Sequence, residues 1–135
     1  MSPTLFLSAL ILVPLMAYQI ARRRVPNHVF GITGAAFGAI VAPLGLGLYS
    51  WYFLSTVGVI PGFLGLALSA IHEVPGFQLA VNLGLIPRFE VVSGTQQNIV
   101  VEAINAVVWS AFYGLLGHAV DYYRRRKRDE KRAQD

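Results

Sequence analysis

The chain has 135 residues, of which 55% are hydrophobic and 13% are charged, and its mean hydropathy is +0.54. A soluble domain carries roughly 25% charged residues and must cover its core with polar side chains. This composition therefore excludes an ordinary soluble domain and indicates an integral membrane protein. The sequence also lacks cysteine, which excludes disulfide bonds, thiolate metal sites and cysteine nucleophiles.

Charged residues are distributed in blocks. None precedes Arg22, none occurs in the 48 residues from Val25 to His72, and none occurs from Ala103 to Val120. The tail at 124–135 holds seven basic and three acidic residues. Basic clusters beside apolar segments mark the cytoplasmic side of a membrane. We therefore assign the net charge of +4 to membrane orientation, and we expect no nucleic-acid partner.

Three segments are long enough to cross a membrane. A helix spanning about 30 Å of hydrocarbon needs about 20 residues. Residues 4–21, 29–49 and 99–123 meet this requirement. The first segment is not a signal peptide, because its positive residues follow the apolar run instead of preceding it. The predicted fold class is an all-α integral membrane protein with three transmembrane helices.

The positions of the basic clusters predict the orientation. If residues 51–72 formed a fourth full span, the tail would lie on the outer side, which the positive-inside rule disfavours. Three spans with the N-terminus outside and the C-terminus inside place both basic clusters on the cytoplasmic side. We expect one membrane domain at 1–123, a basic cytoplasmic tail at 124–135, and location in a bacterial cytoplasmic (inner) membrane. The predicted anchors at the membrane surface are Arg22, Arg23, Arg24, Arg124, Arg125, Arg126, Lys127 and Arg128.

The region between the second and third spans has an unusual pattern. An apolar segment at 51–87 precedes a polar loop at 88–98, and the sequence Val59–Phe63 recurs in similar form at Glu73–Phe77, with Pro-Gly in both copies. Proline favours the first turn of a helix, so each copy predicts the start of a short helix. These helices lie in the outer interface, or form a re-entrant hairpin turning at Pro61, or form a fourth span.

Small residues recur every four positions in the second and third spans. This spacing lets helix backbones approach closely, which favours association inside a membrane. The simplest interpretation is that the two spans pack on each other within one chain, and the alternative is packing against a partner. The predicted packing residues are Gly34, Gly38, Ala42, Ala106, Ser110 and Gly114.

Four polar residues of the last span form the candidate polar site. Glu102 and Asn105 share one helical face near its outer end, where they either reach the headgroups or form a polar notch facing the Pro-Gly segments. His118 and Asp121 share a face near the inner end, which predicts a local hydrogen bond between them.

The two histidines at the inner ends of spans, His28 and His118, could meet and join Asp121 in a metal-binding, pH-sensing or haem-binding cluster. No ligand spacing such as H-x-x-x-H supports this, so we predict no metal or cofactor. The sequence also contains no nucleophile elbow, P-loop or zinc-protease motif, and we predict no catalytic residues.

These observations favour a small polytopic protein that acts as a non-catalytic accessory or scaffold subunit. Its expected partners are the lipid bilayer and either another membrane protein or further copies of itself. One alternative is pore formation, because the layout of three spans and a basic tail resembles that of phage holins, although the long outer segment departs from it. Another alternative is a proton- or ion-conducting oligomer that uses Glu102.

Overall fold

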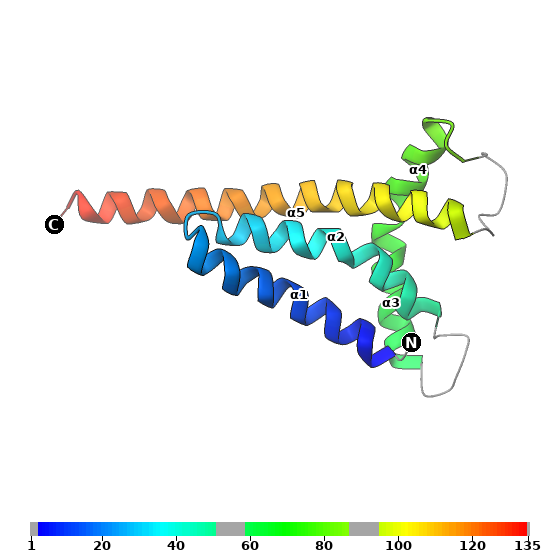
Figure 1. Cartoon of the computed structure of the whole chain (residues 1–135). Helices are drawn as coiled ribbons and strands as arrows, with labels where there is room; N and C mark the ends of the chain where they lie inside the picture. Colours follow the sequence, from blue (N-terminus) through cyan, green and yellow to red (C-terminus); the bar gives the residue numbers. More distant parts are fainter. Residues whose placement is uncertain (1–2, 51–58, 87–94, 135) are drawn as a thin grey trace.

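The computed structural model describes residues 3–50, 59–86 and 95–134 (Figure 1). The regular structure of these residues is entirely helical, which confirms the predicted all-α class. Three of the helices are long and apolar enough to cross a membrane, which confirms the three predicted spans at the level of length and composition. The helices are α1 (Pro3–Arg24), α2 (Val29–Ser50), α3 (Val59–His72), α4 (Val74–Asn82) and α5 (Thr95–Arg132).

A tight turn joins α1 to α2. Val25 N–H donates to the carbonyl of Ala21 at 2.8 Å, and His28 N–H donates to the carbonyl of Val25 at 2.9 Å. Pro26 restricts the residue before it to extended conformations, which ends α1 at Arg24. The three arginines in the last turn of α1 also complement the negative end of its helix dipole.

Helix α2 lies between α1 and α5 and packs against both (Figure 1). It runs antiparallel to α5, and glycines form the contact. A side chain at Gly34 would collide with the backbone carbonyl of Tyr113, and one at Gly38 would collide with that of Trp109. Gly117 meets the Phe30 backbone in the same way. The two helices are therefore in backbone contact along much of their length.

The other predicted packing residues also lie along α2 and α5. Ser110 Oγ donates to the carbonyl of Ala35 at 2.6 Å, and Ala42 is fully buried. A Cβ atom added to Gly114 would lie 3.3 Å from the Cβ of Ala35, which is a looser contact than at Gly38. Ala106 is half-buried on α5.

Helix α5 continues past the predicted end of the span at residue 123 and reaches Arg132. The predicted boundary marks the end of the apolar run and not the end of the helix. Arginine, lysine and glutamate favour helices, and Arg126 Nε pairs with Glu130 one turn later at 3.0 Å. The basic tail is thus a helical continuation of the last span over most of its length.

Helices α3 and α4 lie across the α2–α5 pair near the Thr95 end of α5 (Figure 1). Pro61 falls in the first turn of α3, where a helix does not need its N–H group. Of the three alternatives, the hairpin that turns at Pro61 is therefore wrong. The chain breaks instead at Glu73, with a bend of 41° between Gly62–His72 and Val74–Asn82. The pair is long enough to count as one bent span, but its direction crosses the other spans.

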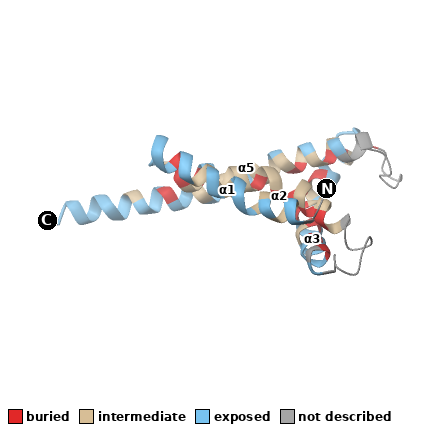
Figure 2. Cartoon of the chain, turned by 60° about the horizontal axis from the view of Figure 1, so that its bottom comes forward, coloured by how far each residue is buried: buried red, intermediate tan, exposed pale blue. Residues whose placement is uncertain are grey.

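Apolar side chains cover the outside of this bundle. In α1, Ile11 and Met16 are 68% and 60% exposed, and the outward surface of α1 is exposed along its length (Figure 2). A soluble protein does not display such a continuous apolar surface to water. These side chains are positioned to contact lipid.

The α2–α5 contact generates a prediction. Replacing Gly38 with alanine should lower the free energy of unfolding by about 1–3 kcal/mol, because the added methyl group collides with a backbone that cannot move without separating the helices. Gly114→Ala is the matched control on the same interface. Its milder contact is offset by the roughly 1 kcal/mol that alanine gains over glycine in a helix. Detergent-solubilised unfolding midpoints measure both variants, and equal midpoints would contradict the assigned packing.

Candidate functional site

Polar side chains gather in two places where α5 meets the other helices. We call the first the break cluster, because it surrounds the break between α3 and α4. We call the second the turn cluster, because it lies at the turn between α1 and α2. The break cluster consists of His72, Glu73, Glu102, Asn105, Trp109 and Tyr113, and the turn cluster consists of His28, His118 and Asp121.

Asn105 is the centre of the break cluster and is fully buried. Its Oδ1 atom accepts a hydrogen bond from the backbone N–H of Gly76 at 2.7 Å. This N–H lies in the first turn of α4, where helical N–H groups have no partner within the helix. A side chain at Gly76 would collide with the Asn105 amide, so the Pro-Gly sequence lets α5 approach the start of α4. The sequence left two positions open for Asn105, and in the structure its side chain faces the second Pro-Gly segment instead of reaching the headgroups.

Two aromatic side chains of α5 hold the end of α3. Trp109 Nε1 donates to the backbone carbonyl of His72 at 2.8 Å. The centroids of the Trp109 and His72 rings lie 4.4 Å apart. His72 Nδ1 lies 2.7 Å from the carbonyl of Leu68, and its Nε2 lies 2.9 Å from the hydroxyl of Tyr113. Because a carbonyl can only accept, Nδ1 carries the proton in the neutral ring and Nε2 accepts from Tyr113.

A pair of carboxyl groups adjoins this network. Glu73 lies between α3 and α4, outside the three long helices, and Glu102 lies beside it on α5. Burial, together with the Glu102 carboxyl, raises the pKa of Glu73 to about 8. The Nδ2 atom of Asn105 donates to Glu73 Oε2 at 3.5 Å. Glu73 Oε1 and both oxygens of Glu102 are buried and receive no hydrogen bond from another described residue, so the two carboxyl groups are hydrogen-bond partners for each other. The pair could therefore accept protons or contact a cation.

The turn cluster holds the start of α2. Asp121 is 5% exposed, and its Oδ2 accepts a hydrogen bond from the N–H of Gly31 at 2.9 Å. A carboxylate at this position satisfies a free N–H of the first turn and complements the positive end of the helix dipole. The predicted local hydrogen bond between His118 and Asp121 is not formed, because His118 faces α2 and meets His28 instead. The His28 Nδ1 and His118 Nε2 atoms are 3.2 Å apart, and the rings stack at 4.8 Å.

The predicted meeting of His28 and His118 thus occurs, with Asp121 on the same side of α5. The oxygen of Asp121 that faces α2 is already bound by a backbone N–H, however. Across residues 3–50, 59–86 and 95–134, no group of three or more histidine, aspartate or glutamate side chains is placed to hold a metal ion.

Sequence reasoning identified Glu102, Asn105, His118 and Asp121 and anticipated the contact of His118 with His28, but it missed the partner residues of the other three. The break cluster joins residues separated by 29 to 41 positions in the chain, and a helical period relates only residues on one helix. One usable signal was present. The second Pro-Gly copy predicts a helix start, and the first turn of a helix needs a hydrogen-bond acceptor such as the Asn105 side chain.

Each cluster thus joins a helix end to side chains of α5. Comparison of the chain with protein family models, curated proteins and solved structures gives no match. A functional assignment therefore depends on the geometry of the helices and on the surfaces that they leave accessible.

Proposed function

We propose that this chain is a non-catalytic accessory or scaffold subunit of a membrane assembly. The observation that carries the proposal is an apolar ridge on α5 that remains uncovered in the folded chain. The ridge consists of Ala103, Val107, Ala111 and Leu115, all exposed. Val107 and Leu115 are 70% and 72% exposed, although α5 packs against α2 and α4 elsewhere on its surface.

The ridge has the form of a helix-packing surface. Its residues follow each other at four-residue intervals and alternate small with large side chains, and such rows interdigitate with the grooves of another helix. Small residues within a row let a second backbone approach, and close packing is a main source of association in membranes. The smaller residues Ser110 and Gly114 of α5 are already in contact with α2. The ridge is therefore a second surface, available to a transmembrane helix of another chain.

The proposal predicts that a ridge variant loses its partner. Ala111→Phe should abolish stoichiometric co-purification in mild detergent, because the larger side chain prevents close approach along the ridge. Ala70→Phe is the matched control, since Ala70 is an exposed alanine on α3 away from the ridge. Differently tagged copies in the same cells distinguish self-association from a different partner. A monomeric wild-type chain, or equal recovery with both variants, would contradict the proposal.

The orientation that we propose has the N-terminus outside and the C-terminus inside, in a bacterial cytoplasmic membrane. The end of α1 with its three arginines and the basic end of α5 lie at the same end of the bundle (Figure 1). Positive clusters favour the cytoplasmic side. The α3–α4 pair then crosses the outer part of the bundle, with Ile60 and Phe63 84% and 64% exposed to the interface.

The absence of native cysteine makes this orientation directly testable. Leu83→Cys, in the exposed turn after α4, should react with a membrane-impermeant maleimide in intact cells. Gln134→Cys, after the end of α5, should react only after the cells are permeabilised. The reverse pattern would place the basic tail outside and would overturn the assigned topology.

A second candidate function is proton or ion conduction by an oligomer, and the carboxyl pair favours it. Buried carboxyl groups that face each other are expensive inside a membrane protein and are typical of ion and proton pathways. Purified protein in liposomes should then carry a proton flux that Glu102→Gln removes. Glu130→Gln is the control, because Glu130 is exposed on the basic tail and pairs with Arg126. Equal fluxes from wild type and Glu102→Gln would exclude Glu102 from conduction.

A further inference from the structure

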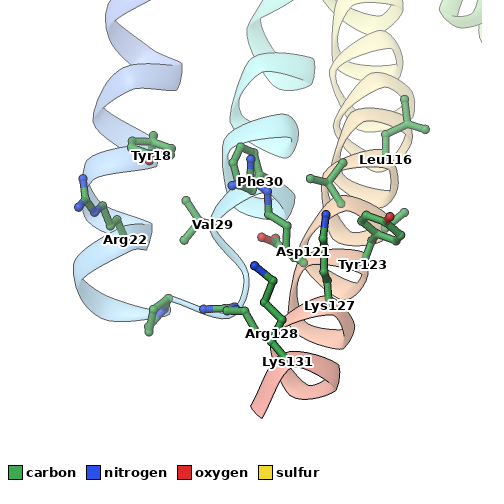
Figure 3. Close-up of a pocket in the computed structure, with 14 residues that line it drawn as sticks. Tyr18, Arg22, Val29, Phe30, Leu116, Asp121, Tyr123, Lys127, Arg128 and Lys131 are labelled. Carbon is green, nitrogen blue, oxygen red and sulfur yellow. The ribbon is translucent and has the colours of Figure 1, made fainter. Parts of the chain in front are cut away.

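A large open pocket lies at the end of the bundle that carries the basic residues. It has a volume of about 980 Å³ and lies between α1 and α5, with the start of α2 behind it (Figure 3). The pocket exists because α2 packs on both neighbours and separates them. Val29 and Phe30 form its back wall, and Tyr18 of α1 meets the edge of Phe30 at 6.2 Å between ring centroids.

The face of α5 that lines the pocket changes its chemistry along the helix. Leu116 and Val120 line the part within the span, and Arg124, Lys127 and Lys131 line the part beyond it. These positions recur at intervals of three and four residues, so they form one continuous stripe. The change from apolar to basic occurs at Tyr123, near the predicted end of the span. Such a stripe matches a molecule with apolar chains and an anionic head.

The charge in the pocket is strongly positive. Its basic residues are Arg22 from α1 together with Arg124, Lys127, Arg128 and Lys131 from α5. Its acidic residue, Asp121, has one oxygen bound by the Gly31 N–H at the start of α2. Arg124 lies 4.2 Å from the centre of the Phe30 ring, a cation–π contact that holds this charge at the boundary between the apolar and basic parts.

We propose that this pocket binds one molecule of an anionic phospholipid. The acyl chains lie along the Leu116 and Val120 part of α5, and the phosphate lies among the basic side chains of α1 and α5. Basic pockets between transmembrane helices are suited to anionic headgroups. A free phosphate ion would use the basic part alone and would leave the apolar wall without a role. The proposal is independent of the accessory-subunit function, because the pocket and the ridge occupy different faces of α5.

The test is native mass spectrometry of the purified chain, titrated separately with phosphatidylglycerol, phosphatidylcholine and inorganic phosphate. Wild type should bind phosphatidylglycerol in a one-to-one complex in preference to phosphatidylcholine. The triple variant Lys127→Gln, Arg128→Gln and Lys131→Gln should bind it roughly a hundredfold more weakly, given the contribution of each basic residue near a membrane surface. These three side chains are exposed on the helix, so the variant should fold.

Matched variants distinguish lipid binding in the pocket from general electrostatic attraction of anionic lipid to the basic residues. The control triple Arg23→Gln, Arg126→Gln and Arg132→Gln removes the same charge outside the pocket and should weaken binding by no more than about fivefold. Ala119→Phe fills the apolar part without changing charge and should also reduce phosphatidylglycerol binding, whereas Ala70→Phe should not.

Four results would overturn the proposal. Equal losses in both triple variants would show diffuse electrostatic attraction. Undiminished binding in Ala119→Phe, or phosphate binding as tight as that of phosphatidylglycerol, would show that the apolar wall is not used. Equal binding of phosphatidylcholine and phosphatidylglycerol would show that the basic residues do not select an anionic headgroup.

Discussion

The backbone contact between α2 and α5 is the interaction on which the rest of the structure depends. It exists because Gly34, Gly38 and Gly117 have no side chains to hold the two helices apart. Inside a membrane, burial of apolar area gives little drive for association, so close packing must supply it. Once α2 is fixed on α5, α1 is carried with it through a four-residue turn, and α3 packs on the far end of α2.

Helix α5 also supplies polar groups to the ends of the other helices. Asp121 accepts from the start of α2, Trp109 donates to the end of α3, and Asn105 accepts from the start of α4. Unpaired backbone groups at helix ends cost several kcal/mol each where water is excluded. These three side chains therefore have structural partners in the backbone of other helices, and the carboxyl pair at Glu73 and Glu102 stands apart because its two buried groups face each other.

The faces of α5 suggest how the proposed roles coexist. One face is occupied by α2, another carries the exposed ridge, and a third lines the basic pocket. Because the basic tail continues the helix, the charges of the tail keep a fixed angular relation to the span. A disordered tail with the same composition would attract anionic lipid generally, but it would not combine these charges with an apolar wall.

The sequence by itself determined the membrane character, the three spans and the two short helices that begin near Pro-Gly pairs. Hydropathy, segment length and proline position depend only on residues that are neighbours in the chain, so the sequence is sufficient to predict the elements that they specify. It also identified Asn105 and Asp121 as unusual, because a polar residue near a membrane core is conspicuous without a structure. It marked the end of the last span at residue 123 but not the end of the helix at Arg132, because hydropathy detects where lipid ends and not where helical hydrogen bonding ends.

Only the tertiary structure decided which residues meet. Asn105 reaches Gly76, Trp109 reaches the His72 carbonyl, and Asp121 reaches Gly31 instead of bonding locally with His118. These contacts depend on how deeply glycines let the helices approach and on where α3 and α4 cross them, which no single-helix period encodes. The basic pocket has the same origin, since it forms where the start of α2 keeps α1 and α5 apart.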